Sequence, residues 1–145
     1  MKLQQLSVFL ENRPGRLDAP LEAIAAAGIN ILTLSLADTA QFGILRLIVR
    51  DWERAQQVLE DGGWIVNSTE VIAVDVEDRP GGLAAVLKVL DQAGVNIEYM
   101  YAFSSHRPDK AMLIFRFENT DQAQQVLMTH GLRIVDGSEL VGAAD

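Results

Sequence analysis

Hydrophobic and polar positions alternate in two separate parts of the chain, with the period of two that is typical of a β-strand. The two segments are Leu6, Val8 and Leu10, and again Ile72, Val74 and Val76. In both cases an Arg-Pro-Gly turn follows directly and ends the strand pattern. The alternation therefore predicts two strands that occupy equivalent places in the chain.

A helical pattern follows each turn, with apolar residues at spacings of three and four that would form one face of a helix. They are Leu21, Ile24 and Ala25 after the first turn, and Leu83, Val86, Leu87 and Leu90 after the second. Gly28 and Gly94 stand where such helices commonly end, since glycine accepts a left-handed conformation at little cost.

The rest of each half repeats one further order of elements. Strands are predicted at 31–37 and 44–49 in the first half and at 97–104 and 112–117 in the second. Short helices with Asp51 and Thr120 as N-caps follow, and then last strands at 64–66 and 132–135. The order is βαββαβ twice. We predict an α+β fold of two ferredoxin-like modules in tandem, each an antiparallel sheet with its helices on one face.

Direct sequence similarity between the halves supports this organisation. Of the 21 columns that begin at Glu11 and at Glu77, 11 are identical at a constant offset of 66 residues. Farther along, Ala55–Leu59 recurs as Ala123–Leu127 at an offset of 68. We place the two extra residues in the loop around 105–110, and we expect one module at 1–69 and the other at 70–145.

Composition removes several classes of function. The chain has no cysteine, which excludes disulfides, thiolate nucleophiles and cysteine-based metal sites. Its net charge is −8, so its surface disfavours nucleic acid and anionic membranes. No segment has the roughly 20 apolar residues of a membrane helix. We expect a soluble cytoplasmic protein that needs no metal or cofactor.

The duplicated turn carries the main candidate chemistry. Glycine lets the backbone turn sharply into a helix N-terminus, whose unpaired N–H groups favour an anion such as the carboxylate of an amino acid. An ammonium group would then need an acceptor. The candidates are the amides of Asn30 and Asn96 and the carboxylates of Glu11, Glu77, Asp78 and Glu98. The alternative is a Pro-Gly turn that only turns, with asparagines that cap nearby backbone.

These residues resemble a known family. Each half is similar to the ACT domain, and together the two halves cover nearly the whole chain. The similarity lies in the order of a strand, the motif Arg-Pro-Gly-x-Leu, a helix, and the motif Ala-Gly-(Ile/Val)-Asn-Ile that leads into the next strand. That resemblance implies a ferredoxin-like fold and a regulatory module that binds amino acids or related metabolites next to a neighbouring module. The residues that it implicates are Asn12, Arg13, Gly15, Leu17 and Asn30 in the first copy, and Asp78, Arg79, Gly81, Leu83 and Asn96 in the second.

The two copies differ at two positions near the predicted site. Pro20 stands where the second copy has Val86, and we expect Asp18 to act as N-cap of a helix that starts late. Glu98 stands where the first copy has Leu32. This carboxylate has two interpretations of equal weight: it holds an ammonium group, or it bonds exposed backbone N–H groups. We expect the second copy to supply the more polar half of any site.

Other functions were weighed against this one. His106 and His130 are the only residues that could act as bases near neutral pH. His106 lies beside two serine hydroxyls, but a nucleophile–base pair also needs an orienting group, and two histidines without a paired spacing do not make a metal site. The row Tyr99, Tyr101 and Phe103 is expected to be buried against the other module or a second chain rather than to stack a ligand. We therefore expect no enzyme, but a homodimeric metabolite-binding regulator that acts in trans on a separate protein, such as an enzyme. The alternative is a structural interaction module with degenerate pockets.

Overall fold

The computed structural model describes residues 2–11, 13–38, 42–103 and 109–144. The chain divides into two compact units. The first unit is Gln4–Thr69, and the second unit is Glu70–Asp145 together with Met1–Leu3.

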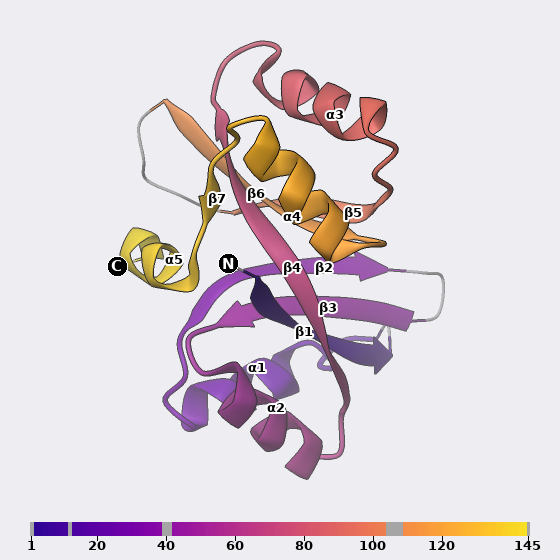
Figure 1. Ribbon diagram of the computed structural model, residues 1–145. Helices are drawn as coiled ribbons and strands as arrows, with labels where there is room; N and C mark the ends of the chain where they lie inside the picture. Colours follow the sequence, from indigo (N-terminus) through magenta and orange to yellow (C-terminus); the bar gives the residue numbers. More distant parts are fainter. Residues whose placement is uncertain (1, 12, 39–41, 104–108, 145) are drawn as a thin grey trace. The chain divides into compact units, whose positions relative to one another are not determined.

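The first unit has the predicted βαββαβ order (Figure 1). Its elements are β1 (Leu3–Glu11), α1 (Asp18–Ala26), β2 (Ile31–Asp38), β3 (Phe42–Val49), α2 (Trp52–Asp61) and the beginning of β4 (Ile65–Glu77). The strands lie in the order β2-β3-β1-β4, and β3 pairs antiparallel with both β1 and β2. In this order β1 and β3 lie at the centre of the sheet, and β2 lies at its edge.

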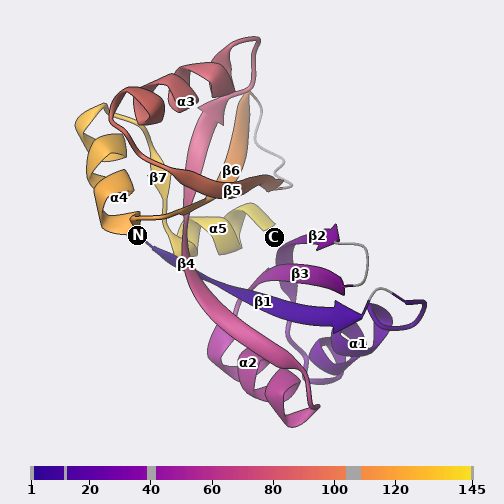
Figure 2. The ribbon, with the colours of Figure 1, turned by 90° about the vertical axis from the view of Figure 1, so that its right-hand side faces the viewer.

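The core of the first unit lies between the sheet and the helices α1 and α2. The alternating residues of β1, Leu6, Val8 and Leu10, are buried as predicted, and alternate residues of β3 are buried beside them. Ile24 and Leu59 from the helices pack with these strands. Asp51 caps α2 as predicted, with its carboxylate accepting a hydrogen bond from the N–H of Arg54 at 3.3 Å. Figure 2 shows that both helices lie on one face of the sheet.

The second unit repeats this arrangement with the remainder of β4 as its first strand. It continues with α3 (Gly82–Gln92), β5 (Ile97–Phe103), β6 (Lys110–Phe117), α4 (Thr120–Thr129), β7 (Ile134–Val135) and α5 (Gly137–Ala144). The strand order is β7-β4-β6-β5, which is the order of the first unit again. The predicted fold class is thus confirmed, with two ferredoxin-like modules, each with two helices on one face of a sheet.

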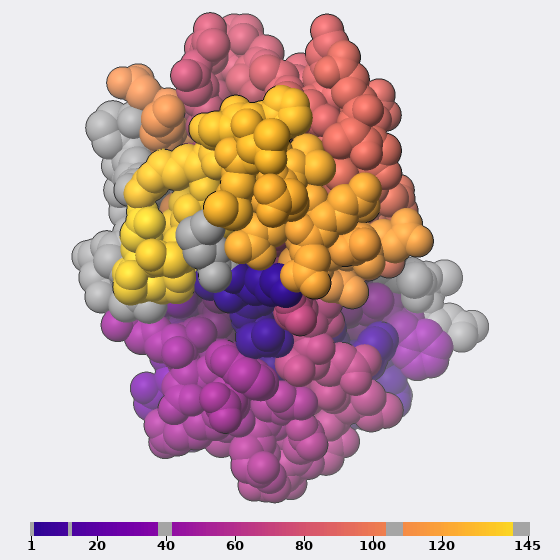
Figure 3. All heavy atoms as spheres, viewed as in Figure 1, coloured from indigo at the N-terminus to yellow at the C-terminus, as the bar shows by residue number. Residues whose placement is uncertain are grey.

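Helices α3 and α4 cover one face of the second sheet and form the surface in front of it in Figure 3. Val86 and Leu90 of α3 and Leu127 of α4 pack against alternate residues of β4 and β6. Among those sheet residues, the rings of Phe115 and Phe117 stack with their centroids 5.4 Å apart. Helix α3 ends before Gly94 as predicted, with a left-handed φ of 71° at that glycine. Helix α4 likewise has a glycine, Gly131, after its C-cap.

The structure corrects several local predictions. The last strand of the first copy and the first strand of the second are one continuous strand, β4, of 13 residues. Asp18 is the first residue of α1 and not its N-cap, which is Leu17, without a capping side chain. Asn119 and not Thr120 caps α4, and it accepts a hydrogen bond from the N–H of Gln122 at 3.1 Å. Helix α1 does begin two positions later than α3 in the repeat, as Pro20 predicted.

Helix α5 was not predicted, and it lies on the side of the second sheet away from α3 and α4 (Figure 2). Its N-terminus is capped by Asp136, whose carboxylate accepts hydrogen bonds from the N–H of Glu139 at 2.9 Å and from the Ser138 hydroxyl at 2.7 Å. These bonds, the hydroxyl first, lower the pKa of Asp136. Leu140 is buried and fixes the helix to the unit.

Candidate functional site

The turn of the second unit is built around two adjacent glycines. Gly81 has a φ of 86°, which favours glycine, and it precedes the first residue of α3. The N–H of Gly82 donates a hydrogen bond to the carbonyl of Arg79 at 3.0 Å and closes the turn. Gly82 also lies so close to β4 that a Cβ there would be 2.0 Å from the carbonyl oxygen of Glu77. The absence of a side chain therefore lets the start of α3 touch the end of the strand.

The charged residues of this turn bond one another. Arg79 donates a short hydrogen bond to the carboxylate of Glu77, and both side chains are about half exposed or more. Asp78 is exposed, and its N–H donates to the carbonyl of Asp109 at 3.1 Å. Leu83 is partly buried and packs against the core of the unit.

The first unit has the same turn with different details. Gly15 has a φ of 83°, and Arg13 forms an ion pair with Glu11. Leu17 is partly exposed and precedes α1. Asn12, which was also predicted to bind the ligand, lies outside the described residues.

The asparagines do not lie beside the turns within a unit. Asn96 follows the C-terminal end of α3, whereas Gly81 precedes its N-terminal end. The helix has 11 residues, so the two positions are separated by about 16 Å along it. Asn30, exposed, follows α1 in the same way. The structure therefore does not bring these two parts of the predicted site together inside either unit, and their shared role stays a prediction.

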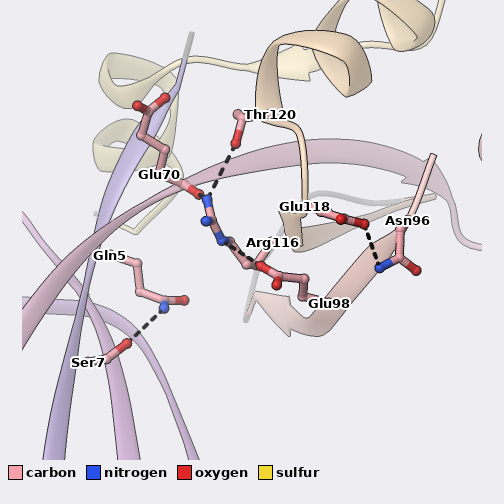
Figure 4. A network of polar contacts seen from close by, with 8 residues as sticks. All are labelled: Gln5, Ser7, Glu70, Asn96, Glu98, Arg116, Glu118 and Thr120. Atoms are coloured by element: carbon pink, nitrogen blue, oxygen red, sulfur yellow. Dashed lines mark hydrogen bonds and ion pairs between the residues drawn. The ribbon is translucent and has the colours of Figure 1, made fainter.

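Asn96 and Glu98 instead belong to a polar network around Arg116 (Figure 4). The Asn96 amide donates to the carboxylate of Glu118 at 3.2 Å. The Arg116 guanidinium donates to Glu98 at 3.0 Å and to the backbone carbonyl of Glu70 at 3.0 Å. The sequence analysis gave Glu98 either a ligand ammonium group or exposed backbone N–H groups as partners. In the structure its carboxylate instead forms an ion pair with Arg116, which neither interpretation had considered. Gln5 and Ser7 of the first unit, also drawn in Figure 4, bond each other at 3.3 Å.

A polar cavity of about 650 Å³ lies next to this network. It is lined by Lys2, Glu70, Arg116 and the residues from Glu118 to Gln122. Lys2 forms ion pairs with Asp121 and Glu70, and these hydrogen bonds, that to Asp121 first, raise the pKa of its ammonium. Both cations of the lining already have carboxylate partners, since Lys2 pairs with Asp121 and Glu70 and Arg116 pairs with Glu98.

A second cavity of about 280 Å³ lies at the turn of the second unit, between the end of β4, the first turns of α3 and the segment before β7. Its floor is apolar, with Val76, Ala85, Val86 and Leu132. Charged side chains surround this floor: Asp75, Glu77, Arg79, Lys110 and Arg133. An apolar floor with a few polar groups around it is the usual composition of a small-molecule site. We refer to it as the second-unit cavity.

Sequence reasoning had missed three of these charged residues. Asp75 is buried, with a side chain only 4% exposed, and it accepts a hydrogen bond from Arg133, which also bonds Glu139 of α5. The bond to Asp75 is the main reason why the pKa of Arg133 is raised. Lys110 is at the start of β6, opposite Glu77. An available signal was that Asp75 interrupts an apolar strand and replaces Phe9 of the first copy.

The two histidines were the remaining candidates, and the structure describes one of them. His130 is the C-cap of α4, and its Nδ1 lies 2.9 Å from the carbonyl oxygen of Val126. His106 lies outside the described residues. Within the described ranges, no three His, Asp or Glu residues are placed to hold a metal ion. No helix there is long and apolar enough to cross a membrane. Phe103 is buried, and Tyr99 and Tyr101 are half-buried.

Two ferredoxin-like modules in tandem, each with a glycine turn before its first helix, define the class of this protein as a pair of small α+β domains. The family model for the ACT domain pair matches residues 1–143. The chain therefore belongs to the ACT domain pair family, which confirms the resemblance in the sequence.

Solved structures agree with this assignment. Protein BT0572 from Bacteroides thetaiotaomicron is 40% identical, with a TM-score of 0.90 over 97% of this chain and 96% of that one. The regulatory subunit of aspartate kinase from Thermus thermophilus shares the fold at 16% identity, with a TM-score of 0.62 over 87% and 91% of the two chains. Among curated proteins, the comparison finds no match.

Proposed function

We propose that this protein binds a small metabolite, an amino acid or a related carboxylic acid, and regulates a separate protein in response. The observation that carries the proposal is the second-unit cavity, which lies at one of the two duplicated glycine turns and combines an apolar floor with charged groups around it. Its volume of about 280 Å³ is at the lower end for ligand sites and suits a metabolite of amino-acid size. A regulatory role is consistent with the fold shared with a regulatory subunit of aspartate kinase.

Thermal unfolding in the presence of free amino acids and 2-oxo acids, each at millimolar concentration, tests the proposal. A ligand that binds only the folded state stabilises it by about 2.7 kcal/mol at 100 times its dissociation constant. We expect a selective rise in Tm for one chemical class. The absence of any shift across the panel would contradict metabolite binding and favour the interaction module.

A matched pair of variants locates the site. Gly81→Ala and Gly15→Ala place a side chain at a φ of 86° and 83°, and neither new Cβ meets another atom within 4 Å. Both variants therefore carry the same backbone strain, about 1–2 kcal/mol. We expect Gly81→Ala to weaken the ligand-induced shift and Gly15→Ala to leave it unchanged.

The role of Glu98 is tested separately, because its carboxylate already bonds Arg116 at 3.0 Å. If Glu98 holds the ammonium of an amino acid, Glu98→Gln lowers affinity for that ligand. An unchanged affinity would eliminate this role and leave the ion pair as its whole contribution.

A homodimer is supported by the edge of the first sheet. Leu34 and Leu36 of β2 are 46% and 50% exposed, and the register with β3 places them on the helix side of the sheet, level with Leu47 and Leu45. An edge strand with exposed apolar residues favours pairing with another chain. Sedimentation equilibrium should give a dimer that Leu34→Lys dissociates, whereas Met100→Lys, at the equivalent position of β5, should leave it intact.

A further inference from the structure

The second-unit cavity has a counterpart at the same place in the first unit. That counterpart, of about 350 Å³, is lined by Phe9, Leu10, Glu11, Arg16, Gly62, Gly63 and Trp64. The repeat offset pairs Val76, Glu77, Gly131 and Leu132 of one cavity with Leu10, Glu11, Gly63 and Trp64 of the other. The two hollows are therefore the same feature of the fold, and differences between them show what each copy has gained or lost.

The difference is one of charge. Asp75, Lys110 and Arg133 of the second unit correspond to Phe9, Phe42 and Ile65 of the first. The strand registers agree, because Glu77 pairs with Lys110 in β4–β6 and Glu11 pairs with Phe42 in β1–β3. Three charged residues thus line one cavity at positions that are apolar in the other copy, where only Phe9 of the three lines the counterpart and Arg16 stands in place of Gly82.

Most of the charges at the second-unit cavity already have partners. Glu77 bonds Arg79, and Asp75 bonds Arg133, which bonds Glu139 as well. Among the described residues, Lys110 forms no ion pair, although it lies opposite Glu77 in the ladder. The cavity therefore presents one ammonium group without a counter-ion, and both lining carboxylates are engaged by arginines.

We propose that the second-unit cavity, and not its counterpart in the first unit, binds a small carboxylate that carries no ammonium group, of the class of short-chain 2-oxo acids. The ligand carboxylate pairs with Lys110, and its aliphatic tail lies against Val76, Val86 and Leu132. This assignment rests on the proposed function, since it specifies the ligand class of the regulator.

The charges discriminate against the corresponding amino acids. An α-ammonium group placed beside a carboxylate held by Lys110 would find no unengaged carboxylate among the lining residues, and it would be repelled by Lys110. Only the zwitterion meets this repulsion, so it binds less well than the oxo acid with the same side chain. The matched pair of 2-oxoisovalerate and valine isolates this single difference.

Isothermal titration calorimetry of the full chain with 2-oxoisovalerate and with valine is the test. We expect 2-oxoisovalerate to bind at least about tenfold more tightly than valine, the effect of one charge-assisted hydrogen bond. Lys110→Met should weaken 2-oxoisovalerate binding by about tenfold, and Lys110→Arg should retain most of it. Lys88→Met removes the same charge from an exposed position of α3 outside the cavity and should change nothing.

The outcomes separate the two proposals. Equal or tighter binding of valine, or unchanged affinity in Lys110→Met, overturns the ligand class while a metabolite-binding function stands. If neither 2-oxoisovalerate, pyruvate nor their amino-acid counterparts bind, both the ligand class and the proposed function are wrong.

Discussion

The contact between α3 and β4 can be tested by adding one methyl group. Gly82 is the first residue of α3 and is buried. An added Cβ would lie 2.0 Å from the carbonyl oxygen of Glu77 and 3.0 Å from its carbonyl carbon. Since real Cβ atoms essentially never come within 3.0 Å of such an atom, α3 and β4 must separate by about 1 Å in Gly82→Ala. A backbone carbonyl in a strand cannot rotate away as a side chain would.

Two terms of opposite sign set the magnitude. Overpacking a well-packed site costs about 1–3 kcal/mol, and we take about 3 kcal/mol because the collision is with the backbone. The helix propensity of alanine exceeds that of glycine by up to about 1 kcal/mol. This gain applies here because the φ of Gly82 is not left-handed. The net expectation is a loss of about 2 kcal/mol in the free energy of unfolding.

Thermal unfolding followed by far-ultraviolet circular dichroism measures this loss. For a unit of this size, about 2 kcal/mol corresponds to a fall of roughly 8–16 °C in Tm. Gly43→Ala is the control, because its nearest neighbour is Leu36 at 3.5 Å, an ordinary contact. A Gly82→Ala protein as stable as the wild type, or more stable, would refute the close approach of α3 to β4.

Three further predictions concern packing and capping. Leu90→Ala should lower the free energy of unfolding by about 3 kcal/mol, because Leu90 is fully buried in the second core. Leu87→Ala should lower it by less, because Leu87 is half-buried, and urea unfolding of both variants measures the difference. Asp51→Ala should cost about 1 kcal/mol by removing the cap of α2, and tryptophan fluorescence from Trp52 and Trp64 reports this loss. The pKa of Asp136 is lowered in the fold, so its contribution to α5 is present above the unfolded pKa and disappears as the pH falls through the folded one. The hydrogen-exchange protection factor of the Leu140 N–H, which is bonded to the Asp136 carbonyl at 3.1 Å, should fall in acid. It should not fall in Asp136→Asn, which caps the helix without titrating.

Patterns that repeat in the sequence predicted the structure best. The alternation of Leu6, Val8 and Leu10 identified a strand with those three side chains in the core, and the same reasoning applied to β4. Gly28 and Gly94 were assigned to helix ends, and both have a left-handed φ. These features depend on local geometry and on one buried face, which sequence periodicity expresses directly.

Predictions failed where one copy departs from the other. Helix α5 has no counterpart in the first copy, although its start, Asp136-Gly137-Ser138-Glu139, has the spacing of a capping box that could have been recognised. The continuity of β4 was missed because Thr69 and Glu70 carry no apolar signal. Whether a strand continues through polar residues is decided by pairing with distant strands, which no local pattern encodes.

The candidate site shows the same limit in its chemistry. Duplication identified the glycine turns, because both copies keep them, but duplication also directed attention away from residues that occur once. Asp75, Lys110 and Arg133 come from β4, β6 and the segment before β7, and their sequence separations conceal that they surround one cavity. Comparison of the copies by their differences would have found all three, since each replaces an apolar residue. In a duplicated protein, positions that both copies keep therefore indicate what the fold needs, and charged replacements at matched positions indicate where the chemistry of one copy differs from that of the other.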